Sequence, residues 1–209
     1  MMALSGANRL ATNRKLDLAA ERALVEQCRR QNFEAFSKIV DAYQARVFGF
    51  VRRMVRNEEE ALDVTQDVFI KAYRHLDRFD GRSSLRTWLF RIAHNLCIDR
   101  IRRRRRLPSE TTLEPAALEG EQIDLPDDRW NPERLALSAE LNAVVEQAIG
   151  TMSDKLRTVL LLHDKEDLGY DEIARTVDVP VGTVKSRLFL ARAHLQRHLG
   201  RYLKSGVDA

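Results

Sequence analysis

The chain has 209 residues, of which 44% are hydrophobic and 32% charged, so it can form one ordinary domain or two small ones. It holds no stretch of about 18 apolar residues and no apolar run near its start, so we expect neither a membrane span nor a signal peptide, and a cytoplasmic protein. The net charge is +4, but residues 1–106 carry 23 basic and 13 acidic side chains, whereas residues 107–139 carry 2 and 8. This segregation suggests a polyanionic partner for the basic segments.

Helical spacing dominates the first half of the chain. Apolar residues recur at intervals of three and four from Phe33 onward, which predicts one long amphipathic helix that ends near Asn57. A shorter helix is expected before Gln31, and another helix begins near Glu58. We expect the helix after Glu58 to turn five apolar residues inward: Leu62, Phe69, Ala72, Tyr73 and Leu76.

The segment FDGRSS interrupts this helical pattern. Asp80 and Gly81 favour a turn, and Ser83 or Ser84 is suited to cap the helix that follows. That helix carries apolar residues on one side: Leu85, Trp88, Leu89, Ile92, Leu96 and Ile101. It completes a predicted four-helix bundle over residues 17–106, which follows an N-terminal extension, residues 1–16, that we expect to be disordered.

The two cysteines, Cys28 and Cys97, lie at core-like helical positions without CxxC spacing. They fit buried thiols in a reducing compartment. The sequence leaves a disulfide between them open.

Residues 107–131, LPSETTLEPAALEGEQIDLPDDRWN, are acidic and hold three of the five prolines, which is typical of a flexible linker. Asn131 and Pro132 then start a helix that Gly150 can cap, and Ser153 starts the next one. We therefore expect an all-α chain with two small helical domains, the second over residues 132–209.

The stretch YDEIARTVDVPVGTVKSRLFLARA has the pattern of a helix-turn-helix. Ile173, Ala174 and Val177 form the packing face of its first helix, and Val184 and Leu188 anchor its second helix. The turn calls for a residue with positive φ, which an aspartate tolerates better than most residues, and Asp178 stands there.

The helix expected after Pro180 is basic and has no acidic residue up to position 204. In a major groove its charges would face phosphates, so they need no partner in the free protein. The alternative is a solvated basic face that closes a helical bundle. Lys185, Ser186 and Phe189 are placed to approach base edges. The helix carries six cations: Lys185, Arg187, Arg192, Arg197, Arg201 and Lys204.

Two charged surfaces are expected in the first half. Four polar residues share one helix face, which is either an ordinary solvated face or a docking face for a basic protein: Glu59, Asp63, Gln66 and Asp67. The arginine run 102–106 favours contact with nucleic acid or an acidic protein over a role in packing. Trp88 and Phe90 are candidates for stacking on exposed bases, although the spacing of Trp88 is more typical of a core residue, whereas Phe90 lies off the apolar stripe.

Two stretches together resemble the extracytoplasmic-function group of bacterial sigma factors, over roughly residues 20–203. The first is EEALDVTQDVFIKAYRHLDRFDGRSSLRTWLFRIAHNLCIDRIRR, and the second is LGYDEIARTVDVPVGTVKSRLFLARA. The resemblance implies a region 2-like domain over 17–106 and a region 4-like domain over 132–209. It also implies a protein that is not an enzyme and needs no cofactor or metal.

The resemblance implies that the chain binds core RNA polymerase, directs it to promoters and helps to melt them. The expected partners are the clamp coiled coil of the beta-prime subunit, the flap of the beta subunit, promoter DNA and an anti-sigma protein. The polymerase-binding residues would be Glu59, Asp63, Gln66, Asp67 and Phe69. The minus-ten element would be bound by Phe79, Asp80, Gly81, Arg82, Ser83, Ser84, Trp88, Arg91 and Asn95. The minus-thirty-five element would be bound by Thr183, Lys185, Ser186, Arg187, Phe189 and Arg192.

The sequence departs from the family at Leu190, where relatives frequently have arginine, so the recognised promoter sequence is not inferred from them. Two other functions are compatible with parts of the sequence. One is a helix-turn-helix regulator that binds duplex DNA without polymerase. The other is a nuclease that holds magnesium with Glu59, Asp63 and Asp67, although no catalytic lysine or histidine stands close in sequence. His194 and His198 resemble a metal-binding pair but lack a third ligand nearby.

Overall fold

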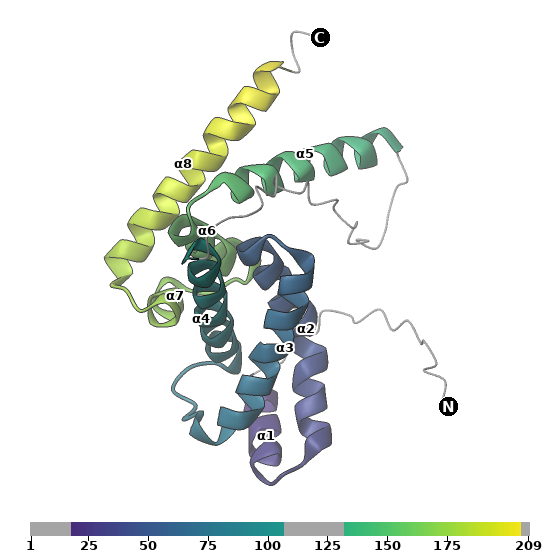
Figure 1. Ribbon diagram of the computed structural model, residues 1–209, viewed down its shortest axis with the longest axis vertical. Helices are drawn as coiled ribbons and strands as arrows, with labels where there is room; N and C mark the ends of the chain where they lie inside the picture. Colours follow the sequence, from purple (N-terminus) through teal and green to yellow (C-terminus); the bar gives the residue numbers. More distant parts are fainter. Residues whose placement is uncertain (1–17, 107–131, 206–209) are drawn as a thin grey trace.

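The computed structural model describes residues 18–106 and 132–205, and all regular secondary structure in these ranges is helical (Figure 1). The all-α prediction is therefore confirmed. Residues 1–17, 107–131 and 206–209 lie outside the described part, and with them the expected N-terminal extension and linker. The helices of the first half are α1 (Leu18–Arg29), α2 (Phe33–Val55), α3 (Glu58–His75) and α4 (Leu85–Arg106). Those of the second half are α5 (Pro132–Thr151), α6 (Asp154–Leu160), α7 (Tyr170–Val177) and α8 (Val181–Ser205).

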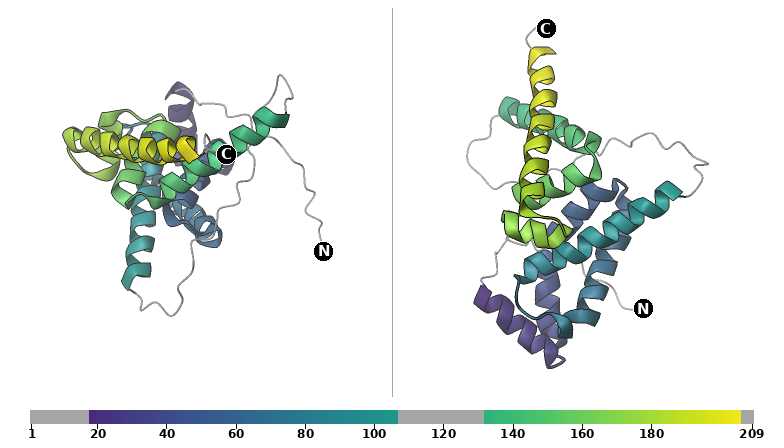
Figure 2. Two further views of the ribbon diagram at one scale, coloured as in Figure 1. Left: turned by 90° about the horizontal axis from the view of Figure 1, so that it is seen from above. Right: turned by 90° about the vertical axis from the view of Figure 1, so that its left-hand side faces the viewer.

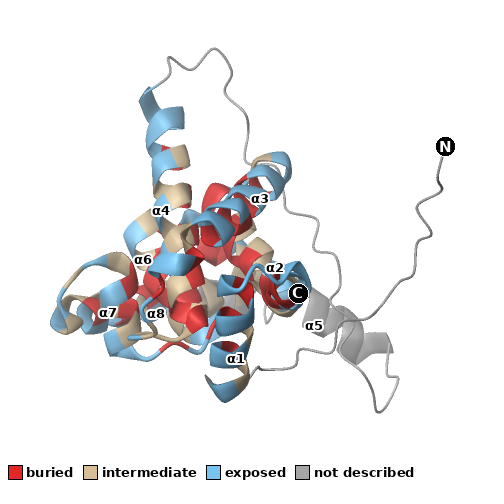
Figure 3. Cartoon of the chain, turned by 90° about the horizontal axis from the view of Figure 1, so that it is seen from below, coloured by how far each residue is buried: buried red, intermediate tan, exposed pale blue. Residues whose placement is uncertain are grey.

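Polar caps set where the helices of the first half begin. The Asn32 side chain accepts hydrogen bonds from the backbone N–H groups at the start of α2, and Asn57 does the same at the start of α3. The Ser84 hydroxyl accepts from the Thr87 N–H at 3.1 Å and caps α4, as predicted. α2 packs against α1, α3 and α4, so their buried faces meet in one core (Figure 3).

The inward face of α3 differs from the prediction. Phe69, Ala72 and Leu76 are buried as expected, but Leu62 is 57% exposed and Tyr73 44% exposed. α3 has apolar residues on two faces, and the face with alanine and valine lies against α2 and α4. Small and β-branched side chains permit this close approach, whereas the bulkier Leu62 and Tyr73 are left outside. The buried face consists of Ala61, Val64, Thr65, Val68, Phe69 and Ala72.

The second half contains the predicted helix-turn-helix. Asp178 adopts the left-handed conformation, with φ of 54°, and joins α7 to α8. Ile173, Val184 and Leu188 are buried between these helices. A π-helical turn, Leu161–Lys165, follows α6, and α5 continues through the predicted Gly150 cap to Thr151. α8 packs against α5, α6 and α7, and its C-terminal end projects from the body of the molecule (Figures 1 and 2).

The two halves pack against each other. α7 lies on α4 and α6 lies on α2, and a single cluster of buried apolar residues runs through both halves. Arg46 pairs with Glu166 at 2.8 Å across this boundary, and Arg53 pairs with Glu146 at 2.7 Å. The sequence predicted two helical units but did not predict this contact between them.

Both cysteines are buried free thiols, which settles the question of a disulfide between them. Burial raises the pKa of Cys28 and of Cys97. Within residues 18–106 and 132–205, no helix combines the length and the hydropathy that crossing a membrane requires.

Candidate functional site

The solvent-facing side of α3 carries both polar and apolar side chains. Glu59, Asp63, Gln66 and Asp67 are all exposed, as a docking or solvated face requires. Ile70, which is 41% exposed, and Leu62 lie among them. A surface that combines exposed leucine and isoleucine with carboxylates offers both apolar contact area and charge complementarity to a basic partner.

Phe69, the fifth residue expected to bind polymerase, does not lie on this surface. Its side chain is only 8% exposed and belongs to the core that α3 forms with its neighbours. In this conformation Phe69 supports the helix from inside, so the expected direct contact is not available to it.

The loop between α3 and α4 has an anchored base and an exposed tip. Phe79 is buried and its ring lies 5.3 Å from that of Trp88, while Arg29 donates a hydrogen bond to the Phe79 carbonyl oxygen. Gly81 has φ of +71°, a conformation that suits glycine, at the tip of the turn. Asp80 accepts a hydrogen bond from the Arg82 N–H at 3.0 Å, and both side chains are exposed.

A pocket of about 310 Å³ lies beside this loop, between α1 and α7. Ser83 and Ser84 line it from the loop, and Glu21 lines it from α1. Glu21 is buried, accepts a hydrogen bond from the Leu85 N–H at 3.0 Å, and also accepts one from the Tyr43 hydroxyl. Glu21 thereby fixes the first turn of α4 to α1 and α2.

The middle of α4 presents two of its candidate residues to solvent. Arg91 and Asn95 are exposed one helical turn apart, and Trp88 is half-buried against the core. Phe90 is fully buried, edge-on to Phe50 at 5.5 Å, so its proposed stacking on bases is wrong. α4 packs against α2, α3 and α7, so it is buried over a wider face than its apolar stripe, and Phe90 lies against Phe50 of α2.

In the arginine run at the end of α4, two arginines contact other parts of the protein. Arg104 donates to the Val55 carbonyl oxygen at 3.1 Å and lies 3.8 Å from Glu60, and Arg105 pairs with Asp154 at 2.8 Å. The expectation that the run does not serve packing is therefore wrong for these two arginines. The remaining members of the run, also exposed, are Arg102, Arg103 and Arg106.

The basic helix α8 displays most of its candidate residues. Lys185 is exposed, with its Nζ 5.8 Å from the centre of the Tyr170 ring, and Phe189 is 73% exposed. The Ser186 hydroxyl donates to the Thr183 carbonyl oxygen at 3.0 Å, which holds it against the helix. Arg187 is half-buried, and Leu190, at the departure from the family, is 53% exposed.

Arg192 differs from the expectation that the cations of this helix lack partners. Its Nη2 lies 2.9 Å from Asp164 of the π-helical turn, and this pairing raises the pKa of Arg192. The side chains of Arg201 and Lys204 lie outside the described residues.

Glu172 of α7 is the main polar residue that sequence reasoning missed. Its carboxylate accepts a hydrogen bond from the Thr87 hydroxyl at 2.6 Å and one from the Ser84 hydroxyl at 3.3 Å, and lies 3.8 Å from Arg86. Burial alone would raise the pKa of Glu172, but these contacts and a hydrogen bond from the Gly169 N–H lower it below its ordinary value. The spacing of Gly169 and Glu172 signals a helix cap in the sequence, but nothing local signals the contact with α4.

No group of three or more histidine, cysteine, aspartate or glutamate residues in the described parts of the chain is placed to hold a metal ion. The three carboxylates Glu59, Asp63 and Asp67 therefore do not form such a group. His194 and His198 have ring centres 4.6 Å apart, and the Nε2 of His194 lies 2.9 Å from the Thr151 hydroxyl, with which it shares a hydrogen bond.

Comparison with known proteins assigns both halves of the chain. The family description Sigma-70 region 2 matches residues 39–107, and Sigma-70, region 4 matches residues 143–195. The chain is 40% identical over 187 residues to the RNA polymerase sigma-H factor of Pseudomonas aeruginosa, which covers 88% of this chain and 96% of that protein. It is 37% identical to the ECF RNA polymerase sigma factor SigW of Bacillus subtilis, covering 84% of this chain and 94% of the relative.

A further relative is the ECF RNA polymerase sigma-E factor of Escherichia coli, 38% identical over 82% of this chain and 90% of that protein. Among solved structures, CnrH in complex with the cytosolic domain of CnrY is similar, with a TM-score of 0.63 and 25% identity over 87% of this chain and 98% of that one. The sigma factor RpoE of Bartonella quintana, solved with the anti-sigma factor NepR, shares the fold with a TM-score of 0.60 and 23% identity, covering 79% of this chain and 96% of that one. The chain thus belongs to the extracytoplasmic-function group of the sigma-70 family of RNA polymerase sigma factors.

Proposed function

We propose that this chain binds core RNA polymerase in the cytoplasm, brings it to specific promoters and helps to open them, without a catalytic step of its own. The observation that carries the proposal is the 37–40% identity to sigma factors over more than 80% of the chain, together with the matches to region 2 and region 4. Each alternative accounts for only one half of the chain. A regulator that works without polymerase would explain the helix-turn-helix half, and a nuclease would explain only the carboxylates of the first half.

Docking on polymerase is assigned to the exposed face of α3. Asp63, Gln66 and Asp67 would meet the clamp coiled coil of the beta-prime subunit, and Leu62 and Ile70 would supply apolar contact area beside them. The flap of the beta subunit would bind the second half. The support is the exposure of these side chains on one face of a rigid, well-packed helix.

Opening of the minus-ten element is assigned to the loop before α4 and to the exposed side of that helix. The exposed tip with Asp80 and Arg82 would capture a base turned out of the duplex, beside the pocket that Ser83 and Ser84 line. Arg91 and Asn95 would hold the opened strand. Unpairing a base costs a few kcal/mol, which the pocket and stacking must recover.

Reading of the minus-thirty-five element is assigned to the start of α8, where Lys185 and Phe189 project into solvent. Thr183, Ser186 and Arg187 would contribute contacts to phosphates or bases. Arg192 would have to leave Asp164 in order to contact a phosphate. The exposed Leu190 offers an apolar contact where relatives frequently place a charge, which favours a different base preference.

An anti-sigma protein is proposed as the regulator. The support is that CnrH, which is similar over most of both chains, is described in complex with the cytosolic domain of another protein, CnrY. Such a partner would cover the surfaces that this section assigns to polymerase and DNA.

The function is tested by run-off transcription with purified bacterial core polymerase on a library of genomic fragments, followed by sequencing of the transcript starts. We expect starts at a defined set of fragments that core polymerase alone does not use. Transcription that is the same with and without the chain would contradict the proposal. Tight, specific duplex binding without polymerase would favour the regulator instead.

A further inference from the structure

We propose that α1 is a brace for the loop that opens the minus-ten element, and that Arg29 and Glu21 are the positioning residues that fix the two ends of this loop. This role rests on the proposed function, which assigns base capture to the loop between α3 and α4. α1 itself precedes residues 39–107, which match Sigma-70 region 2, so that match assigns no role to it.

The first anchor holds the end of the loop that follows α3. The Arg29 guanidinium, in the last turn of α1, donates a hydrogen bond to the carbonyl oxygen of Phe79, whose side chain is buried. The same guanidinium lies 3.6 Å from Glu26, one turn earlier in α1, and this pairing helps to hold the Arg29 side chain in place. A charged donor makes a stronger hydrogen bond than a neutral one, so Arg29 ties the loop to α1.

The second anchor holds the end of the loop that leads into α4. Glu21 is buried, and its carboxylate accepts a hydrogen bond at 3.0 Å from the N–H of Leu85, the first residue of α4. The Tyr43 hydroxyl of α2 donates to the other oxygen of Glu21, and burial together with this contact raises the pKa of Tyr43. Glu21 is therefore fixed from α2 while it holds the start of α4.

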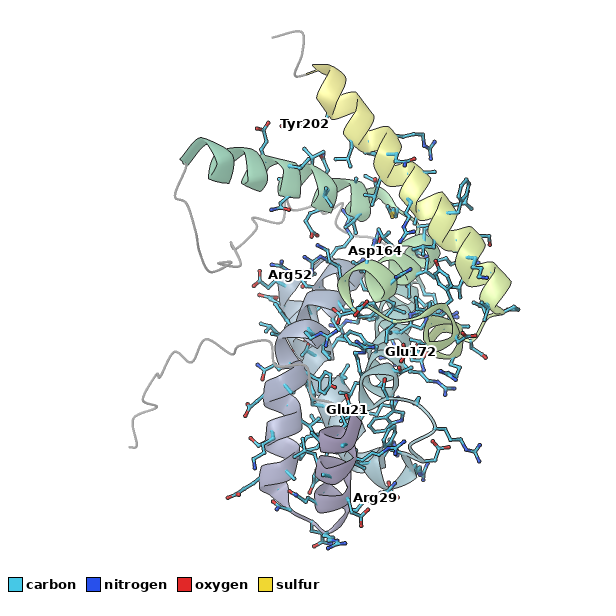
Figure 4. All side chains as sticks on the ribbon, turned by 180° about the vertical axis from the view of Figure 1, so that it is seen from behind. Glu21, Arg29, Arg52, Asp164, Glu172 and Tyr202 are labelled. Carbon is cyan, nitrogen blue, oxygen red and sulfur yellow. The ribbon has the colours of Figure 1, made fainter. Side chains whose placement is uncertain are left out.

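Both anchors belong to one helix, and five residues, 80–84, lie between the two positions that they hold. Glu21 and Arg29 stand eight residues apart, which is roughly 12 Å along a helix. Figure 4 shows them near opposite ends of α1. A loop holds a ligand precisely only when the contacts that support it are themselves fixed. The brace therefore sets the direction in which the exposed tip with Asp80 and Arg82 meets DNA.

The first test measures how firmly the loop is held in the free chain. Arg29→Met keeps the aliphatic stem and removes the donor. Arg30→Met is the matched control, because Arg30 is an exposed neighbour that also pairs with Glu26, at 3.5 Å. Amide hydrogen exchange is followed by mass spectrometry of the peptide that covers residues 79–88. We expect this peptide to exchange about threefold faster in Arg29→Met than in Arg30→Met. Equal exchange would overturn the brace, even if run-off transcription succeeds.

The second anchor is tested with Glu21→Gln in the same exchange measurement. Glutamine keeps the volume but replaces a charged acceptor with a neutral one, and charge-assisted hydrogen bonds are roughly twice as strong as neutral ones. Tyr43→Phe is the control, because it removes the other hydrogen bond of Glu21 and leaves the contact with Leu85. We expect faster exchange in Glu21→Gln than in Tyr43→Phe. Exchange that is no faster would remove Glu21 from the brace.

The last test measures whether the brace serves opening of the duplex. Rates of transcript formation are compared for Arg29→Met and Arg30→Met with core polymerase, on a promoter fragment that run-off transcription has identified. We expect Arg29→Met to be about fivefold slower, because a misdirected loop captures the unpaired base poorly, while core polymerase captures both variants equally. On the same fragment with mismatches across the minus-ten element, no unpairing is needed, so the difference should disappear.

The mismatched fragment separates positioning from stability, because a variant that is merely less stable would be slow on both fragments. Equal rates on the paired fragment, or the same defect on both fragments, would overturn the role of α1 in opening. If the wild type starts no transcripts, the proposed function fails instead, and hydrogen exchange alone decides whether α1 braces the loop.

Discussion

Arg157 offers the sharpest test of how the second half is assembled and joined to the first. It is only 4% exposed, and its guanidinium donates to four backbone carbonyl oxygens, those of Ile149, Gly150, Met152 and Met54, at 2.7–3.2 Å. The first three close the end of α5 onto α6, and the fourth reaches α2. Burial lowers the pKa of Arg157, but an arginine stays charged at neutral pH.

Arg157→Met keeps a similar volume but leaves these four carbonyl oxygens without their donor. A buried polar group left without its hydrogen-bond partner costs about 1–3 kcal/mol, so with several carbonyl oxygens left unpaired we expect the free energy of unfolding to fall by about 3–5 kcal/mol. The measurement is urea unfolding followed by circular dichroism, with the slope against urea compared between variants. Arg105→Met is the control, because Arg105 forms an exposed ion pair worth less than about 1 kcal/mol. A loss below about 1 kcal/mol for Arg157→Met would refute this reasoning.

Three further outcomes are expected. Asp63→Arg/Asp67→Arg should abolish capture of core polymerase in a pull-down, since charge reversal opposes docking on a basic surface; undiminished capture would remove α3 from the interface. Lys185→Ala should weaken promoter binding by the holoenzyme by about 1–3 kcal/mol, and an unchanged footprint upstream would remove Lys185 from the readers. Burial raises the pKa of Glu166 to about 7 although Arg46 opposes this, so the folded state retains a proton that the unfolded chain releases above pH 4.5. Between roughly pH 5 and pH 7, each unit of rising pH should therefore lower the unfolding free energy of the wild type by about 1 kcal/mol relative to Glu166→Gln; parallel pH profiles would contradict this.

The helices were predictable because their signals are local. The interval of apolar residues located α2, and the polar caps Asn57 and Ser84 mark the starts of α3 and α4. The left-handed conformation at Asp178 follows from the turn of a helix-turn-helix, where one residue must reverse the chain.

Faces and long-range contacts were harder to predict. Periodicity locates a helix but does not tell which of two apolar faces turns inward, so Leu62 was assigned to the wrong side. Phe90 is buried through contacts with distant parts of the chain: its ring lies against Phe50 of α2, and α4 packs against α2, α3 and α7. The pairing of Glu172 with Thr87 has the same origin, and a carboxylate on a helix surface looks the same in sequence whether it faces solvent or another half of the chain.

The two buried thiols can serve as intrinsic probes of local and global unfolding. Cys28, at the edge of the core near the end of α1, is 9% exposed, whereas Cys97 in the middle of α4 is completely enclosed. A thiol reagent reacts with the thiolate, which both sites disfavour while they remain enclosed. The reaction of Cys28 therefore reports fraying of α1, and that of Cys97 reports loss of the whole core. A comparison of the two reaction rates shows whether α1 opens before the rest of the core.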